Sequence, residues 1–179
     1  MGKQTEQDIT NLLITNYRNT LISTGEQVGA NISFSLLNDK AIREAVLTPF
    51  TADGREFSDR IWSNLSDMNF RLRKELSDGI ARGDSIVKTS KRLQEIFGNT
   101  AYNTQRLIRT ETLATYAKAS VAAYKEAGLE YLEILGEAGA CDECDKNKNL
   151  QLKVIDAEVG INIPPFHPNC KCCVMPVIK

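Results

Sequence analysis

Two short segments near the C-terminal end, Gly139-Ala-Cys-Asp-Glu-Cys144 and His167-Pro-Asn-Cys-Lys-Cys-Cys173, decide how the fold is closed. They contain all five cysteines and the only histidine of the chain, and 22 residues separate them. Cys-x-x-Cys and His-x-x-Cys-x-Cys each have the spacing of half a tetrahedral zinc site, because neighbouring donors can reach one ion from a tight turn. The sequence therefore predicts that the two segments meet around a structural zinc ion.

Six side chains compete for four coordination positions around this ion. The candidate donors are Cys141, Cys144, His167, Cys170, Cys172 and Cys173. We expect both cysteines of the first segment, His167 and Cys172 to bind the zinc, with Cys170 as the alternative to either of the last two. An all-cysteine set that uses Cys170 and either Cys172 or Cys173 stays open. In the expected set, Cys173 is a core or surplus thiol.

The expected role of the zinc is structural rather than catalytic. A catalytic zinc keeps one coordination position open for water and has a general base nearby. The single histidine leaves no second imidazole, and the sequence contains no His-Glu-x-x-His, glycine-rich phosphate loop or Gly-x-Ser-x-Gly motif. Zinc deaminases have His-x-Glu before Pro-Cys-x-x-Cys, whereas here the cysteine pair comes first and follows Ala140. The chain is therefore not expected to be an enzyme.

Helical periodicity dominates the chain up to residue 128. Apolar residues that recur every three or four positions predict helices over 6–24, 36–47, 56–82, 85–97 and about 99–127. In the third of these, the apolar stripe runs from Phe57 to Ile80. Glycines at Gly83, Gly98 and Gly128 are expected to end the last three helices.

The pattern changes to short alternating segments after Leu129. Residues 130–135 and 150–155 predict strands on either side of the first cysteine pair. The expected fold is mainly α, a bundle of about five helices with a small zinc-stabilised β element at the C-terminus (α+β overall). The expected division is an N-terminal helical segment, a helical core and a zinc-binding β module, over residues 1–54, 55–128 and 129–179.

The charge pattern neither requires nor excludes contact with nucleic acid. The chain has a formal net charge of −1. Residues 55–120 contain 12 basic and eight acidic side chains, which is a smaller excess than is usual in proteins that bind DNA through its phosphates. No run of 18 apolar residues occurs, so no membrane partner is expected.

The order of several motifs resembles the phage head morphogenesis family that includes the Mu-like minor head protein F. The motifs are Trp62 early in a long helix, Ile80-Ala-Arg-Gly-Asp-Ser85, Leu107-Ile-Arg-Thr-Glu-Thr112, Ala123-Tyr-Lys-Glu-Ala-Gly128 and the two cysteine segments. The family characteristically ends in His-Pro-x-Cys-Arg-Cys, and here Lys171 replaces the arginine. The resemblance covers about residues 55–175.

This resemblance implies a minor capsid protein that acts near the portal in head assembly and in DNA packaging or ejection. It implies a place in the virion, and in the host cytoplasm during assembly, with the portal and other capsid proteins as partners and packaged DNA as a further one. The family's Arg-Thr-Glu motif maps onto residues 109–111, which implies that Arg109 and Glu111 form an internal structural brace and are not catalytic. The alternative from another class is a DNA-binding protein or a zinc-dependent nuclease or hydrolase acting on the phage genome.

Overall fold

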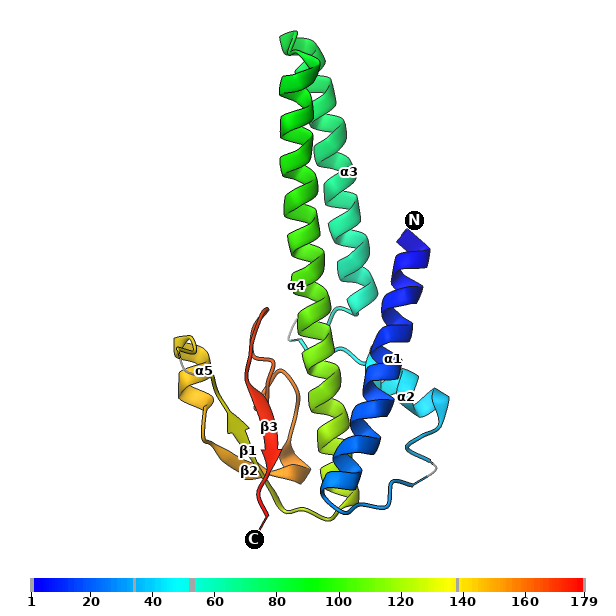
Figure 1. Cartoon of the computed structure of the whole chain (residues 1–179), viewed down its shortest axis with the longest axis vertical. Helices are drawn as coiled ribbons and strands as arrows, with labels where there is room; N and C mark the ends of the chain where they lie inside the picture. Colours follow the sequence, from blue (N-terminus) through cyan, green and yellow to red (C-terminus); the bar gives the residue numbers. More distant parts are fainter. Residues whose placement is uncertain (1, 34, 52–53, 138, 179) are drawn as a thin grey trace.

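The protein has a mainly helical fold with a small antiparallel sheet near its C-terminal end (Figure 1). The computed structural model describes residues 2–33, 35–51, 54–137 and 139–178. Its elements are α1 (Gly2–Gln27), α2 (Asp39–Leu47), α3 (Phe57–Arg82), α4 (Ile86–Glu126), β1 (Tyr131–Leu135), α5 (Asp142–Asn147), β2 (Gln151–Lys153), a 3-10 turn η1 (Val154–Asp156) and β3 (Cys173–Pro176). The predicted fold class is confirmed. Among the described residues, no helix is both long enough and apolar enough to cross a membrane.

The C-terminal half of α4 lies at the centre of the molecule and contributes to two hydrophobic cores (Figure 1). One face presents Ala119 and Ala123, whose small side chains allow close packing against α1 and α2. The buried partners on this side include Leu13, Leu21, Ile42 and Ile61. The other face presents Ala117, Val121 and Tyr124 to the sheet and to the cysteine segments. Because one helix serves both cores, the C-terminal module is packed directly onto the helical part.

A half-buried lysine of α4, Lys118, fixes the end of α2. The Lys118 ammonium group donates hydrogen bonds to the carbonyl oxygens of Ala45 and Thr48, at 2.9 and 2.6 Å. These carbonyls lie at the C-terminal end of α2, where backbone acceptors have no partner inside the helix. The ammonium group also lies 5.8 Å from the centre of the Phe50 ring. Burial lowers the pKa of Lys118 to about 8.

Helices α3 and α4 form a long antiparallel hairpin that projects beyond the rest of the molecule (Figure 1). Gly83 reverses the chain with a positive φ of 65°. The carboxylate of Asp84 then accepts hydrogen bonds from Lys88, Arg82 and Arg92, at 2.7, 2.9 and 2.7 Å. These donors, with Lys88 the strongest, hold the pKa of Asp84 well below its usual range. The reversal is therefore tied to both helices by charged hydrogen bonds.

The prediction that Gly98 ends a helix is wrong. The helices expected over 85–97 and 99–127 are one continuous helix, Ile86–Glu126. A glycine inside a helix costs only about 1 kcal/mol relative to alanine, and packing of α4 along α3 offsets an amount of this size. Gly98 itself lies in open space, since a Cβ atom there would meet nothing within 4 Å.

The apolar stripe of α3 is buried only near the base of the hairpin. Phe57 and Ile61 are buried in the first core. Towards the tip, Ile80, Ile86 and Val87 are 82, 85 and 77% exposed. The distal half therefore carries large apolar side chains that neither core covers.

The sheet has the strand order β2-β1-β3, with both neighbours antiparallel to β1. The strand expected over 130–135 is confirmed as β1. The strand expected over 150–155 is shorter, because Val154–Asp156 form a 3-10 turn after β2. Strand β3 and helix α5 were not expected from the sequence, and both lie beside the cysteines.

Candidate metal centre

Helix α5 positions the first cysteine pair. It follows β1, and Cys141 is the residue directly before its first turn. The carbonyl oxygen of Cys141 accepts a hydrogen bond from the backbone N–H of Asp145, at 2.8 Å. The spacing of three residues brings the side chains of Cys141 and Cys144 to the same side of this turn. Cys144 is 3% exposed and belongs to the core between α4 and the sheet.

A tight turn positions the second segment. The backbone N–H of Cys170 donates to the carbonyl oxygen of His167 at 3.1 Å. Asn169 has a positive φ of 63°, a conformation that asparagine tolerates better than most residues. Its backbone N–H donates to the hydroxyl of Thr110 at 3.2 Å, which ties the turn to α4. Cys172 directly precedes β3 and is buried.

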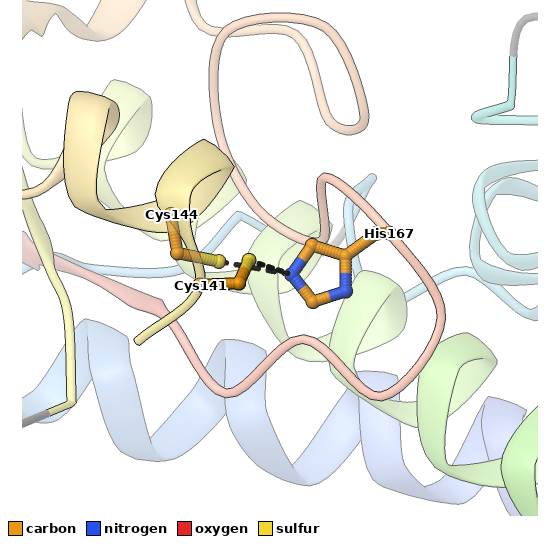
Figure 2. A group of neighbouring side chains, drawn as sticks. All are labelled: Cys141, Cys144 and His167. Carbon is orange, nitrogen blue, oxygen red and sulfur yellow. Dashed lines mark hydrogen bonds between the residues drawn. The ribbon is translucent and has the colours of Figure 1, made fainter. Parts of the chain in front are cut away.

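The two segments bring five donors together, as Figure 2 shows for three of them. The Nε2 atom of His167 lies 3.2 Å from the Sγ atom of Cys141 and 3.0 Å from that of Cys144. The Sγ atoms of Cys144 and Cys170 are 3.7 Å apart. Cys144 belongs to two groups in which all donor atoms lie within 4.8 Å of one another, one with Cys141 and His167 and one with Cys170 and Cys172. Cys144 is therefore the common member of both groups.

The other ring nitrogen of His167 defines its tautomer. Nδ1 lies 2.9 Å from the carbonyl oxygen of Pro168. A carbonyl oxygen can only accept a hydrogen bond, so Nδ1 carries the proton in the neutral ring and Nε2 has a free lone pair. The nitrogen that faces Cys141 and Cys144 is thus the one able to bind a metal ion, in the arrangement usual for metal-binding histidines.

The protonation of the thiols depends on their position. Hydrogen bonding from the backbone N–H of Cys144 lowers the pKa of Cys141, at the start of α5. Burial raises the pKa of Cys144 and of Cys172. Several buried thiolates in one place need a compensating positive charge, and a bound divalent cation supplies it by displacing the thiol protons.

The separations of the donors fit a tetrahedral site for a metal that prefers nitrogen and sulfur. With metal–ligand distances of about 2.3 Å to sulfur and about 2 Å to nitrogen, tetrahedral ligands lie about 3.8 Å apart for sulfur–sulfur and about 3.6 Å apart for sulfur–nitrogen. The separation of 3.7 Å between Cys144 and Cys170 matches the first value. The separations of 3.2 and 3.0 Å from His167 are somewhat shorter than the second. Thiolate and imidazole donors favour zinc over magnesium or calcium. The sixth candidate, Cys173, is exposed and belongs to neither group.

Among the described residues, the Arg109-Thr110-Glu111 segment makes two side-chain hydrogen bonds to other elements, one from Thr110 and one from Glu111. Glu111 is buried and accepts a charged hydrogen bond from Arg60 of α3, with side-chain exposures of 7 and 16%. Thr110 is also buried, and its hydroxyl holds Asn169 of the second cysteine segment. Arg109 is exposed on a different face of α4. The ion pair observed at this point is therefore Arg60–Glu111 rather than a brace that includes Arg109.

Sequence reasoning missed the role of Arg60, and it placed Thr110 in the Arg-Thr-Glu motif without predicting its contact with the second cysteine segment. Arg60 is one of several charged residues in the predicted helix 56–82, and nothing in the local pattern distinguishes it from a solvated arginine. Thr110 had a detectable signal, because it lies seven residues before Ala117 on the face of α4 that meets the C-terminal module. A threonine on that face, about two helical turns before Ala117, is a candidate for binding a backbone group.

Comparison with known proteins identifies one family. A family model described as "Phage Mu protein F like protein" matches residues 71–175. The match covers more than half of the chain, including all of α4, the sheet and the five converging donors. Searches of curated proteins and of solved structures found no match.

Proposed function

The chain belongs to the phage Mu protein F like family, and from this premise we propose that it is a minor capsid protein acting near the portal in head assembly and in DNA packaging or ejection. Membership supports a role in phage head morphogenesis, a place in the virion and association with head proteins. The observation that carries the proposal is the match over residues 71–175, because it includes the C-terminal part of α3, all of α4 and the cysteine cluster. We assign the zinc site to the cysteine cluster and the contact with the portal protein to the hairpin of α3 and α4.

The cysteine cluster is proposed to hold one structural zinc ion. The ligand set is Cys141, Cys144 and His167, completed by Cys172 or by Cys170. In the alternative set His167 is not a ligand, and both Cys170 and Cys172 bind the zinc together with Cys141 and Cys144. Four protein ligands fill a tetrahedral zinc site and leave no coordination position for a catalytic water, which supports a structural rather than a catalytic role. The zinc would join α5 to the start of β3 and so close the C-terminal module.

The distal half of the hairpin is proposed to contact the portal protein. It carries apolar side chains on both helices, among them Phe70, Ile80, Ile86 and Val87, which are mostly solvent-exposed. Exposed apolar residues grouped on one projecting element are typical of protein interaction sites. The hairpin extends away from both cores, so an attached partner would leave the metal centre and the sheet undisturbed (Figure 1).

The test is incorporation of hairpin variants into heads in the parent phage. We expect the double variant Ile80→Ser/Ile86→Ser to remain folded and to be lost from purified heads. The matched control is Ile155→Ser/Ile178→Ser, which changes two isoleucines of similar exposure outside the hairpin and should be incorporated normally. Equal incorporation of both variants would contradict the assignment of the hairpin. Normal, infectious heads after deletion of the gene would contradict the minor capsid role itself.

A further inference from the structure

A cavity of about 450 Å³ lies at the base of the hairpin, between α3, α4 and the loop that leads to His167. We propose that this cavity binds a nucleotide unit, with its phosphate on the arginines that line the cavity and its base against the apolar wall. The inference goes beyond the proposed portal contact, because the cavity is lined by the N-terminal part of α3 and the middle of α4, whereas Ile80 and Ile86 flank the turn between these helices. It also differs from the metal centre, with which it shares only His167.

The first argument is charge. Arg55, Arg60 and Arg106 line the cavity, and among the described residues that line it there is no aspartate or glutamate. Arg60 is held in place by Glu111, by the hydroxyl of Thr51 and by the carbonyl oxygen of Arg55. A guanidinium group fixed in this way is already oriented before a ligand arrives, which reduces the entropy lost on binding. The guanidinium fork of Arg106 can offer phosphate oxygens paired hydrogen bonds.

The second argument is the combination of polar and apolar groups around these charges. Asn64 and Asn103 line the cavity from the two facing helices, and their side-chain amides can both donate and accept hydrogen bonds. Leu107, Pro165 and Phe166 supply an apolar wall with one aromatic ring. A flat base with donors and acceptors on its edge can stack on such a ring. A simple inorganic anion would leave this wall unused.

The third argument is the helical spacing. Arg60 and Asn64 are four residues apart on α3, and Asn103, Arg106 and Thr110 follow at intervals of three and four on α4. Residues at these intervals lie on one helix face. The two facing helices thus place polar side chains opposite each other at this level. The volume falls within the range of roughly 300–1,000 Å³ that is usual for small-molecule sites.

The test is binding to the full chain, loaded with zinc, by titration of three probes. The probes are deoxyadenosine monophosphate, a 5′-phosphorylated oligothymidylate and inorganic phosphate. We expect the first two to bind more tightly than inorganic phosphate, since they alone use the apolar wall. Comparison of the mononucleotide with the oligonucleotide shows whether a free nucleotide or a strand end is preferred. Inorganic phosphate binding as tightly as both would overturn the assignment of the base.

Two variants and a charge-matched control separate a specific cavity from general attraction of anions. Arg106→Ala should weaken nucleotide binding about tenfold or more, because it removes charge-assisted hydrogen bonds. Arg109→Ala removes the same charge from another face of α4 and should change binding less than about threefold in moderate salt. Phe166→Leu should weaken binding of the mononucleotide while leaving that of phosphate unchanged. Equal effects of Arg106→Ala and Arg109→Ala, or absence of binding by the nucleotide probes, would overturn the proposal. Neither result would bear on the proposed role in the phage head, because that role is tested separately by incorporation into heads.

Discussion

Removal of the Glu111 carboxylate should destabilise the protein strongly, because Glu111 is the acidic partner of a buried arginine. The change is Glu111→Ala. In the native protein, Arg60 donates to Glu111, to Thr51 and to the carbonyl oxygen of Arg55. The side chains of Arg60 and Glu111 are 16 and 7% exposed, so water replaces the lost carboxylate poorly. The variant therefore removes the carboxylate that Glu111 supplies to a largely buried positive charge.

The expected loss is at the low end of the range for a broken buried ion pair. Removal of one partner of such a pair typically costs about 3–5 kcal/mol. Arg60 keeps two hydrogen bonds of 2.6 Å, so we expect about 3 kcal/mol. With a urea m-value of about 2 kcal/mol/M, the unfolding midpoint should fall by about 1.5 M. Burial raises the pKa of Glu111, so Glu111→Gln, which keeps an acceptor without a charge, should be less harmful than Glu111→Ala.

The assay is urea unfolding of zinc-loaded protein at neutral pH, followed by far-UV circular dichroism. The control is Arg109→Ala, which removes an exposed charge from the neighbouring helical position and should change the free energy of unfolding by less than about 0.5 kcal/mol. The apolar double variant Arg60→Met/Glu111→Leu should recover much of the loss, since neither charge remains buried. A midpoint for Glu111→Ala within about 0.3 M of the Arg109→Ala value would refute the assignment of the brace.

Three further changes test other parts of the structure. Gly160→Ala should lower the melting temperature, because Gly160 has a φ of 81° and a Cβ atom there would lie 2.1 Å from the carbonyl oxygen of Phe50. Gly98→Ala is the control at an open helical position, and it should instead raise the free energy of unfolding by about 0.5–1 kcal/mol. The pKa of Lys118 of about 8 lies below its ordinary value of 10.5, so the unfolded chain binds more protons between these values and stability should rise with pH there, by up to about 3 kcal/mol. Urea unfolding at pH 7.5 and 10 should show this rise in the native protein and lack it in Lys118→Met. If both proteins had the same pH dependence, the lowered pKa of Lys118 would be contradicted. Thr110→Val should weaken zinc binding about 10–100-fold, as measured by competition with a chelator, whereas Thr110→Ser should not. Equal zinc affinities of the two variants would show that the hydroxyl does not hold the second cysteine segment.

The sequence was sufficient for the type and order of most elements, because hydrophobic periodicity is a local property. It failed at Gly98, where continuous packing between α3 and α4 outweighs one unfavourable glycine. It also missed α5 and β3, because the cysteine segments have little periodicity and their conformation is set by contacts with distant elements. The exposure of Ile80 could not be predicted, since an apolar stripe does not reveal where the neighbouring core ends.

The site was predictable in its members but not in its surroundings. Cysteine and histidine spacing gave six candidate donors, and the fold brings five of them together. Spacing alone could not show that Cys144 belongs to both groups of donors, because this depends on the path of 22 intervening residues. The partner of Glu111 was equally hidden, since Arg60 comes from another helix, 51 residues earlier.

The most direct test of the central claim is the zinc content of Cys144→Ser compared with that of Cys173→Ser. Each variant removes one thiol, but Cys144 belongs to both donor groups and Cys173 to neither. Elemental analysis of the purified proteins should find about one zinc per chain in the native protein and in Cys173→Ser. Cys144→Ser should lose the zinc and, in circular dichroism, the structure of the C-terminal module. A native protein without zinc, or a Cys144→Ser variant that keeps both zinc and fold, would contradict the account.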